Sequence, residues 1–470
     1  MLPKPQNYAI WPSVLPADQA VEMTVTPTEK AFLFPEGLEM TFTIISVNDD
    51  EPNYYHPSTR KQVTAAAHGG VVRFSCNFPG EQEHLILMET AEKKLQEFVV
   101  FSLYDDLYSL QALKGDLHSH SYRSDGKRDP AALAGHYREQ GYDYLALTDH
   151  NRFYPGGEID ETFQGVHLGI TRVPGEEVHA PGTVVHIVHV GGKYSVADLY
   201  VHHRDEYERE AAAYETRVPS HVPEKYRARY ARIMWATDHI HQAGGLAIFP
   251  HPYWRPVASR MYNVCDEFAR LLLTSGMFDA YELVGGMQQP GINRSVALWG
   301  EMLKEGHSFP VVGSSDVHGL EGNAFPNLFN ICFARENTSE AIAEAIKAGR
   351  VVAVEASGSE ENRQYRCYGS LRLMTYAQYL LTHYFPRQQR ICQGEGIAMR
   401  AYAMQDADAS LIEMQVQQTE KFRGRFFGRL PAPVPSPAVL AFEDKWRAEQ
   451  LNGPLTKGGT VDAPPVTRQI

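Results

Sequence analysis

The sequence predicts an α/β fold in three parts: a β-sandwich-like module, a central region of alternating helices and strands, and a partly helical extension. Short β-branched and aromatic runs separated by Pro, Gly and Asn turns fill the first part. From Lys114 the pattern changes to helices that each precede a strand, and from about residue 365 it becomes helical again. We therefore place the parts at residues 1–112, 113–357 and 358–470 of the 470-residue chain.

The first part contains strand-like runs such as Met40–Ile45 and Val71–Cys76. Several short strands with turn residues between them are typical of a small sandwich. Its sequence groups no set of candidate ligands or nucleophiles. We expect it to be a packing or positioning module.

The central part repeats the order helix, glycine, strand. The predicted pairs are Pro130–Gln140 with Tyr144–Thr148, Ala228–Gln242 with Leu246–Phe249, and Ser295–Glu305 with Phe309–Gly313. Repeated units of this kind predict a parallel sheet, open or closed into a barrel. In such folds the chemistry gathers at the carboxyl ends of the strands.

Two segments depart from this repeat. A charged insertion at about residues 196–229 predicts a solvated helix plus loop, with a lid or an oligomer contact as the alternative. Residues 365–430 predict helices, and the proline-rich end from Pro431 onward predicts an extended arm or tail.

Charge and composition exclude several classes of protein. Lys and Arg total 44 against 57 Asp and Glu, and the resulting net charge of −13 speaks against a general polyanion binder. No stretch approaches the ~18 apolar residues of a membrane-spanning helix, and Met1–Tyr8 lacks the layout of a signal peptide. We expect a cytoplasmic protein without a membrane partner. The five cysteines lack zinc-finger or redox spacing and are predicted to be small buried residues.

Histidines and carboxylates follow the predicted strands. His118 and His120 are two residues apart, so they share one face of an extended strand. Asp125 precedes Gly126 in a turn from which it can reach back, and Asp116 can orient a ligating imidazole. This group predicts a metal site.

Four further groups repeat the arrangement. His150 follows an apolar strand, Glu177 is one of two adjacent glutamates, and His251 lies between two prolines. Asp316 and His318 are again two residues apart after an apolar strand. His186 and His189 differ by three, so at most one of them faces the site from a strand.

Taken together, these groups predict a multinuclear metal centre. The nine candidate ligands are His118, His120, Asp125, His150, Glu177, His186, His251, Asp316 and His318. One catalytic zinc needs about three protein ligands, so nine ligands indicate two or three divalent ions. Imidazoles and carboxylates without thiolates favour Zn, Mn or Fe.

These motifs, in this order, resemble those of the PHP (polymerase and histidinol phosphatase) family of metal-dependent phosphoesterases. The matching motifs are DLHSH at 116–120, SDG at 124–126, TDHN at 148–151, PGEE at 174–177, HP at 251–252 and DVH at 316–318. The resemblance covers about residues 113–355 and implies a distorted (β/α)7 barrel with a trinuclear site. It implies that the nine candidate residues above are metal ligands. His186 matches the family pattern less closely, and His189 is the alternative ligand at that position.

The resemblance implies hydrolysis of phosphate esters of small molecules, nucleotides or short oligonucleotides by a metal-activated hydroxide. We expect His318, Asp316 and Arg152 to act in catalysis. Arg123, Arg152 and Arg255 lie beside ligand motifs and are candidates for binding phosphate, because the guanidinium fork matches its oxygens. The alternatives are a carboxylic or carbamic ester hydrolase with the same metals, and a non-catalytic metal-binding protein. Long duplex nucleic acid is not expected as a partner.

Overall fold

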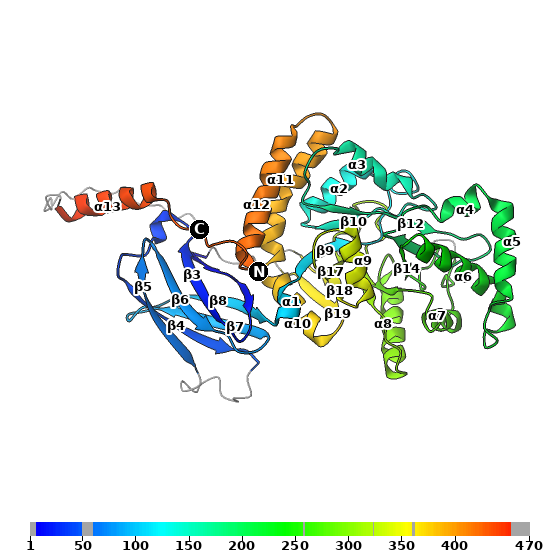
Figure 1. Cartoon of the computed structure of the whole chain (residues 1–470), viewed down its shortest axis with the longest axis horizontal. Coiled ribbons are helices and arrows are strands. Elements are labelled where there is room, and N and C mark those ends of the chain that lie inside the picture. The colour runs from blue at the N-terminus through cyan, green and yellow to red at the C-terminus, as the bar shows by residue number, and fades with distance from the viewer. Residues whose placement is uncertain (1–5, 49–59, 257–258, 323, 360–361, 453–470) are drawn as a thin grey trace, which may run out of the picture.

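The computed structural model contains a β-rich module, an α/β region and a group of C-terminal helices (Figure 1). It describes residues 6–48, 60–256, 259–322, 324–359 and 362–452. A β-rich module and an α/β region lie on either side of a pair of long helices, α11 (Phe385–Ala403) and α12 (Ala409–Phe426). In the described part of the chain, none of the helices has the length and apolar character needed to cross a membrane.

The N-terminal module is one eight-stranded sheet that folds over itself. Its strands are β1 (Tyr8–Trp11), β2 (Val14–Pro16), β3 (Ala20–Pro27), β4 (Glu39–Ser46), β5 (Lys61–His68), β6 (Val71–Asn77), β7 (Gln82–Glu89) and β8 (Lys94–Leu103), in the order β1-β3-β6-β5-β4-β7-β8-β2. β5 pairs with β4 along most of its length and with β6 only at its end, which lets the two halves face each other. Alternating buried side chains fill the space between them, and Phe42 stacks on Phe74 at 4.1 Å.

The α/β region contains two mixed sheets. One has the order β11-β10-β9-β17-β18-β19 and the other β12-β13-β14-β15-β16. Their strands are β9 (Gln111–Asp116), β10 (Tyr144–Ala146), β11 (Thr171–Val173), β12 (Gly175–Val178), β13 (Ile187–Val190), β14 (Leu246–Phe249), β15 (Ala280–Val284), β16 (Val311–Gly313), β17 (Leu328–Ala334), β18 (Val351–Ser357) and β19 (Gln364–Tyr368). Single parallel bridges, Ser119 with Val317 and His150 with Glu177, join the two sheets beyond the strand ends.

The expectation of a parallel sheet is therefore correct only in part. β9, β10 and β11 run parallel, as do β14, β15 and β16. However, β12, β13 and β14 are antiparallel neighbours, and so are β9, β17, β18 and β19. The connection from β12 to β13 is too short for the crossover of a dozen or more residues that parallel strands need. The distorted (β/α)7 barrel stays a prediction.

Helices cover these sheets close to where the sequence predicts them. They are α1 (Asp105–Tyr108), α2 (Pro130–Glu139), α3 (Gly157–Thr162), α4 (Ala197–Val201), α5 (Arg204–Glu215), α6 (Arg227–Gln242), α7 (Asp266–Leu273), α8 (Gln289–Lys304) and α9 (Ser339–Lys347). The insertion forms α4 and α5. α8 begins six residues before the predicted Ser295, because Pro290 fits the first turn of a helix.

The C-terminal part differs from expectation at both of its ends. β19 precedes the first helix, α10 (Leu371–His383), and the proline-rich end contains α13 (Pro437–Asn452) instead of a fully extended arm. Residues 453–470 of the predicted tail lie outside the described residues. Cys265 is exposed and Cys367 is half-buried, so the prediction that all five cysteines are buried is wrong for these two.

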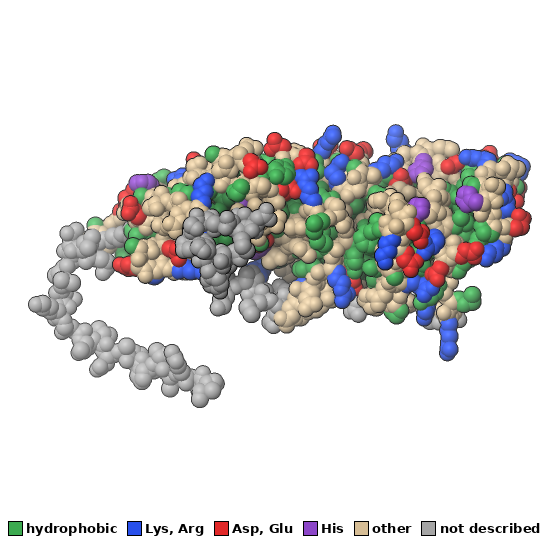
Figure 2. Space-filling view, turned by 90° about the horizontal axis from the view of Figure 1, so that it is seen from below, with side chains coloured by type: hydrophobic (Ala, Val, Ile, Leu, Met, Phe, Trp, Pro, Cys, Tyr) green, Lys and Arg blue, Asp and Glu red, His purple; other side chains and the backbone are tan. Residues whose placement is uncertain are grey.

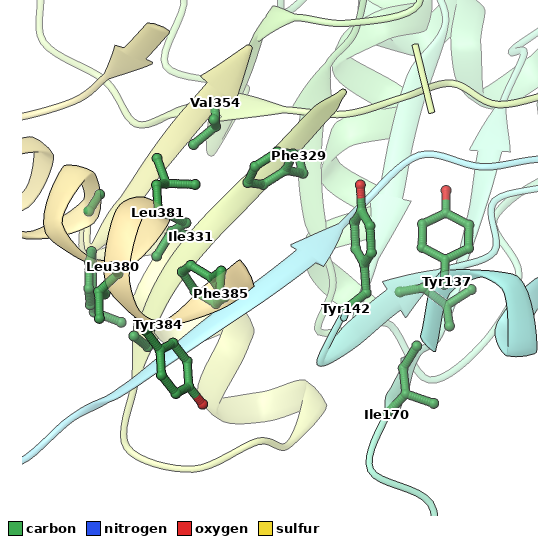
Figure 3. Packing of buried hydrophobic residues seen from close by; sticks show 14 of the residues in the cluster. Tyr137, Tyr142, Ile170, Phe329, Ile331, Val354, Leu380, Leu381, Tyr384 and Phe385 are labelled. Carbon is green, nitrogen blue, oxygen red and sulfur yellow. The ribbon is translucent and has the colours of Figure 1, made fainter. Parts of the chain in front are cut away.

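The C-terminal helices hold the other two parts together. Figure 3 shows Leu380, Tyr384 and Phe385 packed against the side of the sheet that carries Phe329 and Ile331. The Tyr379 hydroxyl donates to the Ser13 carbonyl of the β-rich module at 2.9 Å. These contacts place one continuous core beneath the α/β region and beside the β-rich module.

Candidate metal centre

The nine predicted ligands come together where the two sheets meet. Most of them follow the ends of β9, β10, β14 and β16, whereas Glu177 lies in β12 and His186 directly precedes β13. The bridge between His150 and Glu177 and the bridge between Ser119 and Val317 bring the strand ends of one sheet against those of the other. Residues separated by some two hundred positions in the sequence therefore line one site.

Glu177 is the centre of this cluster. It is 1% exposed, and both of its oxygens face imidazoles. The shortest contacts are 2.7 Å from Oε2 to His150 Nδ1 and 2.8 Å from Oε1 to His186 Nδ1. Oε1 lies 3.2 Å from His251 Nε2, and Oε2 lies 3.5 Å from Nε2 of His118, His120 and His179.

Asp316, which follows β16 of the same sheet as Glu177, also contacts these histidines. Its Oδ1 lies 3.3 Å from His118 Nε2 and 3.0 Å from His120 Nε2. The backbone of Asp316 has a φ of 50°, and its N–H donates to the His118 carbonyl at 2.9 Å. Gly286 makes room for the carboxylate, because a Cβ at that position would lie 2.2 Å from Asp316 Oδ2. This strained backbone holds the side chain in the cluster.

Asp125, His150 and His318 form the exposed side of the cluster. Asp125 Oδ2 lies 3.3 Å from His150 Nε2, and its Oδ1 lies 3.2 Å from His318 Nε2. Gly126 closes the turn by donating to the Ser121 carbonyl at 2.9 Å. A Cβ on Gly126 would lie 2.3 Å from the His120 carbonyl oxygen, so only glycine fits this close approach.

The polar atoms of the cluster fit divalent cations. Five groups of three or four side chains have ligand atoms within 4.8 Å of one another. Among the described residues, several buried atoms of these groups have no hydrogen-bond partner: His118 Nε2, His120 Nδ1 and Nε2, Glu177 Oε2, His186 Nδ1, His251 Nδ1 and Asp316 Oδ1. Unpaired buried polar atoms are costly, and their convergence on one space is what a site for divalent cations requires.

The charges of the cluster are balanced within it. Burial alone would raise the pKa of Glu177 and Asp316, but the imidazoles around them hold both pKa values below their usual range. Burial would lower the pKa of His150, yet contacts with Asp125 and Glu177 raise it to about 10. Burial lowers the pKa of His120 and His186 to about 4. Without cations, protonated imidazoles balance the carboxylates, and cations that bind here replace those protons.

The structure separates the two rival histidines. His186 faces Glu177, whereas His189 is buried on the opposite side of β13 with its Nδ1 at 3.2 Å from Glu176 Oε1. Glu176 also accepts from the Val196 backbone at 2.6 Å, so Glu176 and His189 secure the start of the insertion.

Two residues of the cluster were missed from the sequence. Glu282 in β15 lies 3.0 Å from His118 Nδ1, the ring nitrogen that faces away from Glu177. His179 lies two residues after Glu177 and contacts His150 through a 3.0 Å hydrogen bond. The period-two spacing from Glu177 was a signal for His179, whereas no motif marks Glu282. Asp116 accepts from the backbone N–H groups of His118 and Ser315, so it orders the loops rather than a ring.

The three predicted phosphate-binding arginines lie in different settings. Glu158 occupies the fork of Arg123, with contacts of 2.7 and 2.9 Å. Arg152 is exposed and donates to the Arg123 carbonyl. Arg255 stacks on Tyr262 at 4.2 Å, and its buried Nε has no hydrogen-bond partner among the described residues. Arg152 and Arg255 are therefore better placed for a new partner than Arg123.

Comparisons with known proteins find partial similarities. No family model matches the chain. A stretch of 83 residues is 37% identical to the DNA polymerase/3'-5' exonuclease PolX of Bacillus subtilis, and the match spans 16% of this chain and 14% of that protein. A two-domain protein from Bacteroides vulgatus containing a predicted PHP-like metal-dependent phosphoesterase is similar in structure. It has 19% identity and a TM-score of 0.35, over 56% of this chain and 77% of that chain.

An amidohydrolase from Chromobacterium violaceum with bound sulfate is also similar in structure, with 20% identity and a TM-score of 0.30 over 44% of this chain and 88% of that chain. Each of these matches covers only part of the chain.

Proposed function

We propose that this protein is a hydrolase that uses three divalent cations to cleave phosphate esters. The observation that carries the proposal is the convergence of buried, unpaired imidazole and carboxylate atoms around Glu177. This arrangement supports a metal-dependent hydrolase, and the resemblance of the motifs favours phosphate esters among its substrates. Bound cations would activate water and neutralise phosphoryl oxygens.

The contacts divide the ligands into three cation positions, two of which share Glu177. The first position has His118, His120, Glu177 and Asp316; the second has Glu177, His186 and His251; the third has Asp125, His150 and His318. Each position has at least three ligand side chains, which leaves coordination sites for water and substrate. We assign Asp316 and His318 to catalysis as residues that hold cations. His318 donates its Nδ1 proton to the Asp316 carbonyl at 2.9 Å, and this bond turns its Nε2 toward Asp125 in the third position.

The exposure of the ligand side chains indicates the side from which substrate enters. The His118 and His120 side chains are fully buried, whereas those of His318 and Asp125 are 39% and 55% exposed. Substrate therefore approaches the third position, close to the loop of Arg152. We assign Arg152 and Arg255 to binding phosphoryl oxygens, and Arg123 to holding this loop through Glu158.

The substrates proposed are small phosphate esters, nucleotides or short oligonucleotides. The face seen in Figure 2 mixes Lys and Arg with Asp and Glu and has no continuous basic stripe. A net charge of −13 likewise disfavours long polyanions.

The test is hydrolysis of a panel of esters by protein loaded with zinc or manganese. We expect p-nitrophenyl phosphate or bis(p-nitrophenyl) phosphate to be cleaved faster than p-nitrophenyl acetate. The double variant Asp316→Ala, His318→Ala should lose the activity, while His202→Ala, an exposed histidine of the insertion, should keep it. Faster cleavage of the acetate would favour the carboxylic ester alternative, and undiminished turnover by the double variant would reject the site.

A further inference from the structure

We propose that His179 positions the ring of His150 at the third cation position, and that Tyr200 of the insertion holds His179 in place. The proposal rests on the proposed function and extends it, because neither residue is among the nine candidate ligands. His179 directly follows β12, and Tyr200 lies in α4. The inserted segment thereby acquires a role at the metal centre.

The ring of His150 faces two different groups. Its Nε2 lies 3.3 Å from Asp125 Oδ2, on the side of the third cation position. Its Nδ1 is hydrogen-bonded to His179 Nε2 at 3.0 Å. An imidazole that gives its Nε2 lone pair to a cation carries its proton on Nδ1, and that proton needs an acceptor. His179 Nε2 is the atom placed to accept it.

Glu177 is the other group near this nitrogen. Its Oε2 lies 2.7 Å from His150 Nδ1, but that oxygen has no hydrogen-bond partner among the described residues, so the contact lacks hydrogen-bond geometry. The same oxygen faces His118 and His120 at 3.5 Å, which are ligands of the first position. If Glu177 holds two cations, its oxygens point toward them and are not free to accept the His150 proton. His179 Nε2 is then the remaining acceptor for the Nδ1 proton of His150.

His179 is itself held from two sides. Its backbone N–H donates to Asn151 Oδ1 at 2.9 Å and lies 3.1 Å from the Tyr200 hydroxyl, which donates to the same Asn151 oxygen. Its ring stacks on His186 with centroids 3.7 Å apart. Tyr200 is 4% exposed, so its hydroxyl is a fixed part of this chain of contacts. The contacts lead from the insertion through His179 to His150.

The experiment is a zinc titration of the metal-free protein by calorimetry, with elemental analysis of the zinc retained after dialysis. His179→Ala should keep two ions and bind the third about 10- to 100-fold more weakly, the usual cost of losing the hydrogen-bond partner of a metal-binding histidine. Tyr200→Phe removes only one contact to the His179 backbone, whose N–H keeps its bond to Asn151, so it should weaken the third ion in the same direction by less; unchanged affinity would overturn the role of Tyr200. His179→Gln keeps an acceptor and should recover part of the loss. The matched control is Tyr207→Phe, because that hydroxyl, also in the insertion, donates to the Pro181 carbonyl instead.

The outcomes separate the two proposals. Unchanged affinity for the third ion in His179→Ala would overturn the role of His179 while leaving the proposed function intact. A His179→Gln variant as impaired as His179→Ala would show that an acceptor at this position does not restore the site, which also overturns the positioning role. Wild-type protein that retains no zinc would contradict the proposed function itself.

Discussion

Replacing Glu177 by glutamine should empty two of the three proposed cation positions and leave the fold intact. The two carboxylate oxygens face the ligands of both positions, with Oε1 at 2.8 Å from His186 Nδ1 and Oε2 at 3.5 Å from His118 Nε2. An amide has no charge and only one oxygen to share. Losing an outer partner already costs about 10- to 100-fold in metal affinity, so losing the shared ligand costs at least that at each position. The combined loss is about 100- to 10,000-fold, or about 3 to 5.5 kcal/mol.

Elemental analysis after dialysis measures this loss directly. We expect the wild type to retain three zinc ions per chain and Glu177→Gln to retain one, at the position formed by Asp125, His150 and His318. The matched control is Glu176→Gln, because the neighbouring glutamate is equally buried but contacts His189 on the other side of the strand. Full zinc content in Glu177→Gln would show that the shared carboxylate holds no cation.

Three further predictions concern residues around the cluster and beneath it. Glu282→Gln should weaken zinc binding about 10- to 100-fold in the same titration, because the carboxylate 3.0 Å from His118 Nδ1 orients that ring; unchanged affinity would exclude this role. Burial lowers the pKa of Lys114 to about 7, below its unfolded value near 10.5, so the unfolded chain binds more protons between these pH values. The free energy of unfolding should therefore rise with pH across this window. Lys114→Met should flatten this rise, measured by urea titrations at several pH values. If wild type and variant show the same dependence of unfolding free energy on pH, the pKa of Lys114 is not lowered by burial. Arg138→Leu should destabilise the protein by about 3–5 kcal/mol in chemical denaturation, because it leaves the Glu395 carboxylate, now 2.7 Å from Arg138 Nε, buried without its partner; a loss below about 1 kcal/mol would argue against a paired charge there.

Much of the cluster was predictable because ligands follow short apolar strands at regular spacing. His118 and His120 share a face by the period of two, and the structure places them on either side of Asp316 Oδ1. The same period places His179 beside Glu177, although only the folded chain shows which imidazole it contacts. Glu282 could not be found this way, because the direction in which one carboxylate of a buried strand points depends on the neighbouring sheet.

The fold was predictable in its elements and less so in its strand directions. The order of helix, glycine and strand gave α2, α6 and their following strands nearly to the residue. The antiparallel hairpin of β12 and β13 broke the pattern, since no helix separates these strands. Alternating prolines predicted an extended arm up to the chain end, but Pro437 occupies the start of α13, where a proline costs no backbone hydrogen bond.

If one site holds several cations around a shared glutamate, anomalous diffraction from crystals of the zinc-loaded protein will locate them individually. We predict separate zinc peaks within about 2.0–2.2 Å of the Glu177 oxygens, with imidazole nitrogens completing each position. Zinc peaks that lie away from the Glu177 oxygens, or only elsewhere on the chain, would contradict a site built around this glutamate.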